Sequence, residues 1–496
     1  MPSSAINRPA LRSWSGAIPY RHIAVVIAGS LVTCLLFYPG CMSGDARFSW
    51  SEALTNASAQ YHDWHPPLVA YAWRVLNKLP IQPVPQYANL FIGMVLLFWI
   101  GVALAAEPYA EKLWLWSLFC CAVGLFPPVA AIMSQPLKDG LLCAALTAAY
   151  GGLIVAQTRG SRGAFAFGFA YLFLAMGFRH NAVLAVFPLA LWAARIFVER
   201  FAAGTTWFKR RRLAGLLLGL AAALFLISAS WITNRALTKA TSYPIQGVLT
   251  FDLVGMSALS NKGYLPSLFD DYSRPPNLQG FFGVKGSDIQ ASPRTLENIK
   301  LIYSPVTNLN IYWYGPGKGL RFIDDRGEML ALAAAWLQAI GDDPLTYLRV
   351  RGELFLALFN IKGGLSWPYY CFSPQDSGEI AHRPLPQFYL THRDSILFKG
   401  YAYLIGIVLI VLAAFRWPSF VPVHVRYLAW SGMLYGLGYL FVTADSHFRY
   451  LYWLIVVWTL AVVGIICVAI QSRSRAPQRV GAPPSGPAVA QREAGA

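Results

Sequence analysis

The sequence predicts an all-α integral membrane protein that crosses a lipid bilayer about ten times. Only 13% of its 496 residues are charged, whereas soluble globular proteins carry about 25%. Apolar stretches close to the length of a membrane span recur along the chain. The aromatic content of 15% fits a protein with many membrane–water interfaces, where Trp and Tyr rings settle.

Basic residues decide the expected orientation of the chain. Lys and Arg gather in alternate segments between the apolar stretches, so the positive-inside rule places both termini in the cytoplasm. The formal net charge of +17 is therefore interpreted as topological, rather than as a nucleic-acid-binding surface. The expected spans are 22–38, 87–106, 113–133, 139–157, 163–178, 181–198, 213–233, 398–415, 427–443 and 449–470.

The spans divide the chain into four parts. Residues 1–233 form an N-terminal transmembrane module, and its first external loop covers 39–86. Residues 234–397 form an extracytoplasmic segment, expected to be a mixture of helices and irregular loops. A helix is expected to start at Asp343-Pro344, with Asp as N-cap and Pro at the first helical position, and 303–327 reads as loop. The remaining parts are the C-terminal membrane helices, 398–471, and a disordered cytoplasmic tail, 472–496.

The seven cysteines separate into two groups by position. Cys41 and Cys371 fall in predicted external segments, where a disulfide between them and two free thiols are both open. The others lie in apolar spans and are expected to be inert packing residues: Cys34, Cys120, Cys121, Cys143 and Cys467.

Charged residues gather at the ends of spans on the external side. Charge at membrane depth is costly, so it is usually paired or functional. Mixed carboxylates and cations on one face favour a site that handles an anion, and several basic side chains suit a phosphate or pyrophosphate. The candidates outside the first loop are Lys138, Asp139, Arg179, His180, Asp445, His447 and Arg449.

Each of these short segments also has a plain structural interpretation. Lys138-Asp139 begins a helix, where an acidic residue complements the helix dipole. Arg179-His180 is either a phosphate clamp or a simple loop. The turn from 445 to 449 is either part of an active site or an ordinary solvated turn. The expectation that all three lie on one side favours the functional interpretation.

The first external loop carries the densest group of candidate residues. Asp45, Ser49 and Glu52 have helical spacing, so one helix face would present two carboxylates. A carboxylate near lipid has a raised pKa unless it is paired, which is one way to make a general base. The alternative is a solvated helix start with an exposed face.

The next segment of the loop runs from His62 to an interfacial helix. His62, Asp63 and His65 are either ligands for a divalent metal or a polar helix start. Two prolines then start a short helix on the membrane surface. Its expected buried side is Leu68, Val69, Tyr71, Ala72 and Leu76.

These residues resemble a known family of enzymes. An acidic residue after the first span, Asp45, followed by His65-Pro66-Pro67-Leu68, is similar to the GT-C membrane glycosyltransferases. That group includes the protein O-mannosyltransferases and the bacterial aminoarabinose transferases. The likeness is specific over about 40–80 and diffuse from there to 200, and Arg449-Tyr450 adds to it.

The resemblance implies a glycosyltransferase of the bacterial cytoplasmic (inner) membrane that uses a polyprenyl-phosphate sugar. The acceptor would be an envelope glycan, a lipid or a protein at the outer face. Asp45 would be the base of an inverting displacement. Lys138, Arg179 and Arg449 would stabilise charge on the leaving phosphate.

The chain also departs from the family pattern. Many relatives carry two adjacent acidic residues in the first loop, whereas Ala46 and Arg47 follow Asp45 here. The departure leaves open whether a divalent cation is used and whether Glu52 or Asp63 assists as a second carboxylate. His62, His65, Asp139, His180 and His447 are expected to contact substrate.

Two other classes of function remain in view. A transporter or flippase for a lipid-linked glycan would share the basic residues and a lipid groove, but it predicts broken, charged spans at mid-membrane. A polymer ligase is closer in chemistry. A non-enzymatic receptor or assembly protein would bind its partner through 234–397 and would tolerate changes in the first loop.

Overall fold

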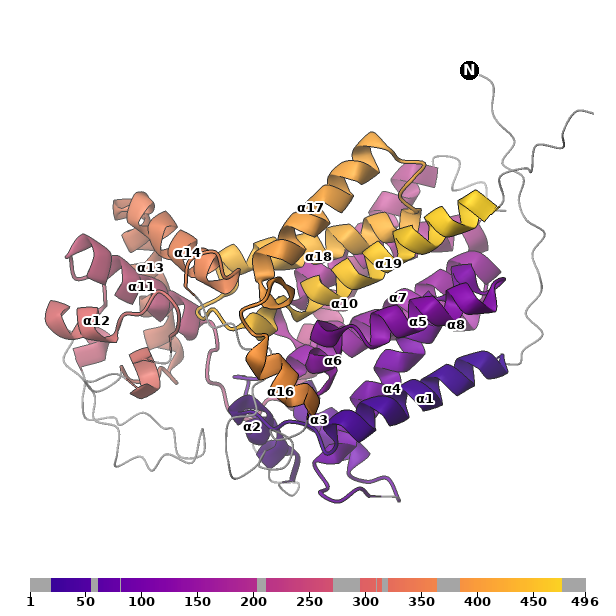
Figure 1. Ribbon diagram of the computed structural model, residues 1–496. Coiled ribbons are helices and arrows are strands. Elements are labelled where there is room, and N and C mark those ends of the chain that lie inside the picture. The colour runs from indigo at the N-terminus through magenta and orange to yellow at the C-terminus, as the bar shows by residue number, and fades with distance from the viewer. Residues whose placement is uncertain are drawn as a thin grey trace, which may run out of the picture.

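The computed structural model is helical throughout the parts that it describes (Figure 1). No strand occurs among those residues, where the only β-type contact is an isolated bridge between His62 and Ala240. The fold class predicted from the sequence is in this respect confirmed. The described residues are 19–54, 61–80, 82–202, 211–270, 295–308, 310–314, 320–363 and 384–474.

A long helical bundle forms one end of the molecule (Figure 1). Each of the ten stretches expected to span the membrane is helical, because their apolar side chains bury well while the backbone satisfies its own hydrogen bonds. The helices are α1 (Tyr20–Phe37), α4 (Ala88–Ala105), α5 (Leu113–Gly124), α6 (Pro127–Met133), α7 (Lys138–Arg159), α8 (Arg162–Phe178), α9 (Val183–Ile196), α10 (Arg211–Leu237), α17 (Gly400–Arg416), α18 (Val423–Val442) and α19 (Tyr452–Ser474). Short turns of helix extend them: η1 (Glu107–Tyr109), η2 (His180–Ala182), η3 (Phe197–Phe201), η8 (Ile396–Phe398) and η9 (Phe448–Leu451).

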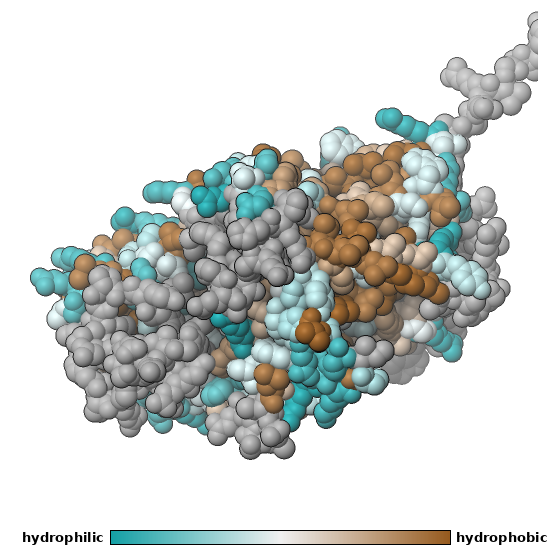
Figure 2. All heavy atoms as spheres, turned by 60° about the horizontal axis from the view of Figure 1, so that its bottom comes forward, coloured by the Kyte–Doolittle hydropathy of each residue, from teal (hydrophilic) through white to brown (hydrophobic). Residues whose placement is uncertain are grey.

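The bundle fits a multi-pass membrane protein, although the ten predicted crossings are not confirmed. Six helices in the described part are long and apolar enough to cross a bilayer. A seventh span results if α5 and α6 count as one, but the chain bends by 64° between them, where Pro127-Pro128 interrupts the apolar run. The other stretches are shorter or less apolar. Figure 2 shows apolar side chains gathered over the bundle and polar ones toward the other end.

Helix α7 is the centre of the bundle. The whole of its apolar window is buried, and it packs against α4 on one side and α8 on another. Glycines permit this close approach: a Cβ at Gly101 of α4 would lie 2.5 Å from the backbone nitrogen of Ala148. Small residues at helix contacts let backbones approach in the same way in other membrane proteins. The buried α7 brings Lys138 to a fixed position at one end of the bundle.

The first external loop folds into two helices beside that end of the bundle (Figure 1). They are α2 (Gly44–Leu54) and α3 (Pro67–Leu76), and Pro66 and Pro67 start α3 as the sequence predicts. Leu68 and Val69 are buried as expected. Tyr71 was wrongly assigned to the buried side: it is 44% exposed, and Trp73 is fully buried in its place. Trp73 packs against Trp50 of α2, so the contact between the two helices sets the orientation of α3.

A second hydrophobic core lies at the opposite end of the molecule from the bundle (Figure 1). Helix α14 begins at Pro344, and the Asp343 side chain accepts a hydrogen bond of 3.1 Å from the Thr346 amide, which confirms the predicted helix start. The elements of this unit are α11 (Gln246–Ser260), η5 (Ser267–Asp270), α12 (Leu296–Ile302), η7 (Asn310–Tyr314), α13 (Arg326–Asp342) and α14 (Pro344–Leu358), and α16 (Pro384–Thr391) follows against the bundle.

The buried Arg351 joins this unit, which the sequence predicts to be external and which is called the external unit below, to the bundle. Arg351 of α14 contacts the carboxylate of Asp252 and the carbonyl oxygen of Thr443, at the end of α18. Trp336 also donates to Asp252, over 2.8 Å. Burial raises the pKa of Asp252 to about 6, although Arg351 and Trp336 oppose the shift. The external unit is therefore anchored beside the turn that carries Asp445.

Some sequence predictions fall outside the described residues. They include the tail beyond Ser474 and the position of Cys371. Cys41 is disulfide-bonded. Each of the five cysteines assigned to apolar spans carries a free thiol.

The close approach of α4 and α7 makes a stability prediction. We expect Gly101→Ala to lower the apparent Tm in detergent, because the added Cβ meets the backbone of Ala148 and overpacking costs about 1–3 kcal/mol. The control is Gly352→Ala, where nothing lies within 4 Å of the added Cβ in α14 and Ala is the better helix former. Equal Tm values for the two variants would contradict the packing assigned to α4 and α7.

Candidate functional site

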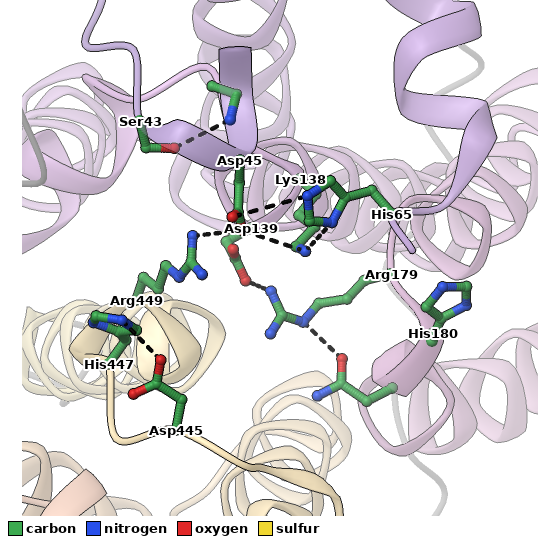
Figure 3. A network of polar contacts seen from close by, with 12 residues as sticks. Ser43, Asp45, His65, Lys138, Asp139, Arg179, His180, Asp445, His447 and Arg449 are labelled. Atoms are coloured by element: carbon green, nitrogen blue, oxygen red, sulfur yellow. Dashed lines mark hydrogen bonds and ion pairs between the residues drawn. The ribbon is translucent and has the colours of Figure 1, made fainter. Parts of the chain in front are cut away.

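The start of helix α2 places Asp45 at the end of the bundle. The Ser43 hydroxyl accepts a hydrogen bond of 3.2 Å from the Ala46 amide and so satisfies one of the free N–H groups in the first turn. Asp45 is then in the first turn of the helix, where a negative charge is favoured by the dipole. Its side chain points into a cluster of cations (Figure 3).

Three basic side chains from separate parts of the chain surround the Asp45 carboxylate (Figure 3). Arg449 Nη1 lies 2.8 Å from Oδ2, and Lys138 Nζ lies 3.4 Å from the same oxygen. His65 Nε2 lies 3.8 Å from Oδ1. The sequence predicts that charged residues at the ends of the spans converge, and these four residues do lie together. Asp45 belongs to α2, Lys138 to α7 and Arg449 to η9, and His65 lies just before α3.

The ring of His65 is held in one tautomer by its neighbour. Lys138 Nζ lies 2.7 Å from His65 Nδ1; because an ammonium only donates, Nδ1 accepts and the ring proton is on Nε2, which faces Asp45. Burial and the adjacent Lys138 hold the pKa of His65 well below its usual range. His65 is thus a neutral ring whose Nε2 faces Asp45 Oδ1 from 3.8 Å, beyond hydrogen-bond distance.

The cations reverse the pKa shift expected for Asp45. Burial alone would raise its pKa, but Arg449 and Lys138 outweigh that effect and hold the pKa well below its usual range. The expectation of a raised pKa applied to an unpaired carboxylate. Asp45 is therefore an ionised carboxylate whose charge is compensated by its neighbours.

A second ion pair lies next to the first (Figure 3). Arg179 contacts the carboxylate of Asp139, which is only 1% exposed, and its Nε donates to Asn181 Oδ1 over 2.7 Å. The Tyr450 ring lies beneath both guanidinium groups, 4.9 Å from that of Arg179 and 5.2 Å from that of Arg449. Three cations and two carboxylates therefore share the site, which leaves an excess of positive charge for an anion.

Asp445 and His447 form a pair beside Arg449. The Asp445 Oδ2 atom lies 2.8 Å from His447 Nε2, and both side chains are buried. Burial raises the pKa of Asp445 to about 8, although Arg449 opposes this, and burial together with Arg449 lowers the pKa of His447 to about 3. Because both side chains are buried, the alternative interpretation of 445–449 as an ordinary solvated turn is wrong.

The other first-loop candidates have different partners from Asp45. Glu52 accepts a hydrogen bond of 2.8 Å from the His62 amide, and burial raises the pKa of Glu52 to about 8. The Asp63 carboxylate accepts from the Ser242 amide and so ties the loop to the external unit. His180 Nε2 lies 3.2 Å from the Asp63 carbonyl oxygen. Glu52, His62 and Asp63 thus organise the loop around the Asp45 cluster.

A cleft of about 680 Å³ opens beside these ion pairs. One part of its lining is polar and basic and includes Lys138, Arg179 and His180. Another part is apolar and includes Met176, Ile227, Trp231, Ile245 and Val442.

Some residues of the site were not among those singled out in the sequence. Tyr439 lies 6.0 Å from the Arg179 guanidinium and lines the cleft. Asn234 of α10 accepts from the Leu68 amide over 3.1 Å and so holds the start of α3. The available signal for Asn234 was its polarity within the apolar run of α10.

The described residues contain no group of three or more His, Cys, Asp or Glu side chains that could hold a metal ion. Comparison with protein-family models, with curated protein sequences and with solved structures finds no match to this chain. The interpretation of the site therefore rests on its own geometry.

The environment of Glu52 makes a pH prediction. Its pKa of about 8 in the folded state exceeds the value of about 4.3 for a free glutamate. Between those values the unfolded chain loses the proton while the folded chain keeps it, so stability falls as pH rises, by at most about 1.4 kcal/mol per unit. Glu52→Gln keeps the acceptor for the His62 amide and removes this dependence.

Thermal unfolding in detergent at pH 5 and pH 8 tests this expectation. From pH 5 to pH 8, the apparent Tm of the parent protein should fall further than that of Glu52→Gln. At pH 8 the variant should be the more stable of the two. Parallel pH profiles for the two proteins would show that Glu52 is not held protonated.

Proposed function

We propose that the protein is a membrane glycosyltransferase that transfers a sugar from a polyprenyl-phosphate donor to an acceptor hydroxyl. The observation that carries the proposal is the placement of Asp45 among Lys138, Arg449 and His65, beside a cleft with one basic and one apolar part. A ligand with a phosphate and a long apolar tail matches both parts.

The basic part of the cleft suits the donor phosphate. Lys138 and Arg179 line it, and Arg449 lies against Asp45 close by. A guanidinium presents a planar fork that matches phosphate oxygens. The apolar part, with Ile227 and Trp231, would take the first prenyl units. These features support a lipid-phosphate ligand but leave the sugar undefined.

The chemical step then follows from these placements. The acceptor oxygen attacks the anomeric carbon, its proton passes to Asp45, and the bond from that carbon to the phosphate oxygen breaks with its electron pair on the phosphate. Lys138, Arg179 and Arg449 stabilise the charge that develops there. Attack opposite to the leaving phosphate inverts the anomeric centre. The products are the glycosylated acceptor and polyprenyl phosphate.

The low pKa of Asp45 is compatible with this role. Arg449 and Lys138 both contact Oδ2 of the Asp45 carboxylate. A bound phosphate gives both cations a second anion, which weakens the compensation of Asp45 and raises its basicity. Asp45 would therefore become an effective base only when the donor is in place.

The sharpest test separates chemistry from donor binding. We expect Asp45→Asn to lower kcat by about 10²- to 10⁴-fold, the range for loss of a general base, while the Kd for polyprenyl phosphate stays equal or falls. Arg449→Met should raise the Kd for polyprenyl phosphate, because it removes a cation near the phosphate site. Transfer is measured in membrane vesicles with a panel of labelled polyprenyl-phosphate sugars.

The matched control is Arg349→Met. Arg349 is 62% exposed at its side chain and pairs with Glu353 on the surface of α14. This variant should keep both transfer and donor binding. Normal transfer by a stably folded Asp45→Asn protein would exclude Asp45 as the base, and unchanged binding by Arg449→Met would exclude the phosphate site.

A further inference from the structure

A second charged cluster lies at the other end of the bundle from Asp45. It consists of His22, Glu107 and Arg159, which are at the ends of α1, α4 and α7 away from the Asp45 cluster. Helix α4 alone separates the two ends by about 27 Å, at 1.5 Å for each of its 18 residues. The two clusters are therefore separate sites.

Glu107 holds this cluster together. Its Oε2 lies 3.2 Å from His22 Nε2, and Arg159 Nε donates to its Oε1 over 2.8 Å. Burial would raise the pKa of Glu107, but these two contacts outweigh it and lower the pKa. Glu107 is thus an ionised carboxylate that is already engaged on both oxygens.

An apolar crevice of about 510 Å³ opens beside the cluster. His22, Glu107 and Arg159 are its charged or titratable lining residues, and the rest is almost wholly apolar. The apolar lining comes from α1, α4, α7 and α8: Ile23, Val26, Ile27, Ile100, Ala103, Leu104, Val155, Ala164 and Phe167.

The crevice contains an unused polar group. His22 is only 5% exposed, and its Nδ1 has no hydrogen-bond partner among the described residues. A buried ring nitrogen without a partner is costly. This nitrogen is therefore a second observation, independent of the apolar lining, that points to a ligand in the crevice.

Charge decides the class of ligand. Glu107 and Arg159 line the crevice, and two further cations, Arg21 and Arg162, are next to its lining residues in sequence. Cations outnumber the single carboxylate, and that carboxylate is occupied by His22 and Arg159. An anionic headgroup is thus favoured over one that carries an ammonium group.

We infer that this crevice is a binding site for an anionic glycerophospholipid of the leaflet opposite to the Asp45 cluster. An acyl chain occupies the apolar crevice between α1 and α8, the phosphodiester lies at Arg159, and a headgroup hydroxyl donates to His22 Nδ1. The occupant fills the space beside α1, which is the least buried of the candidate spans together with Leu213–Leu237. The site is independent of the proposed transfer reaction.

Native mass spectrometry of the full chain in detergent tests this inference. The probes are phosphatidylglycerol and phosphatidylcholine with the same acyl chains. We expect phosphatidylglycerol to bind more tightly, and Arg159→Gln to weaken its binding about tenfold, as for loss of a charge-assisted hydrogen bond. Glu107→Gln removes the carboxylate that competes for Arg159 and should strengthen the binding of phosphatidylglycerol.

The opposite effects expected of Arg159→Gln and Glu107→Gln on lipid binding distinguish a binding role from a folding role. Both variants break the same ion pair, so a structural effect alone would weaken lipid binding in both. Ala164→Phe should also weaken binding, because the ring fills the crevice that Ala164 lines. The matched control is Ala221→Phe, at an exposed position of α10 away from the crevice, which should bind phosphatidylglycerol as the parent does.

Three results would overturn the inference. They are equal binding of the two phospholipids, unchanged phosphatidylglycerol binding in both Arg159→Gln and Ala164→Phe, and displacement of phosphatidylglycerol by polyprenyl phosphate. The last result would assign the crevice to the tail of the transfer donor.

Discussion

Compensation of the Asp45 charge is the constraint on which this end of the bundle depends. A buried carboxylate is tolerated only where cations or hydrogen-bond donors replace the lost water. Arg449 and Lys138 supply that replacement, and in return Asp45 stabilises the buried Arg449 and the half-buried Lys138. The starts of α7 and η9 are thereby held against the start of α2, and the cleft forms beside this junction.

The external unit also helps to position the residues around Asp45. Arg351 reaches from its core to the Thr443 carbonyl, and the Ser446 amide donates to the Val306 carbonyl over 2.9 Å. The turn that carries Asp445 and His447 is therefore held from both sides. A change in the external unit can reach Arg449 through this turn, which gives that unit a structural part in the site.

The two ends of the bundle use charge in different ways. Around Asp45, cations from several elements surround one carboxylate beside a larger, partly polar cleft, which suits an anion that enters and leaves. Around Glu107, one carboxylate is enclosed by His22 and Arg159 beside a smaller, apolar crevice. The second arrangement suits a lipid that stays bound while α1 remains weakly packed.

Local signals in the sequence determined the helices and the starts of several of them. Apolar runs become helices because the backbone must pair with itself in lipid, and Pro67 and Pro344 mark helix starts because their fixed φ suits the first turn. Charge at the ends of spans also identified Asp45, Lys138 and Arg449 as members of one cluster. Tertiary structure alone decided which charges pair. Asp45 lies with Arg449, and Glu52 lies with a backbone amide, so the two carboxylates of one helix have pKa values shifted in opposite directions. Spacing along a helix could not reveal this difference, because the partners come from distant segments and burial alone would raise both values.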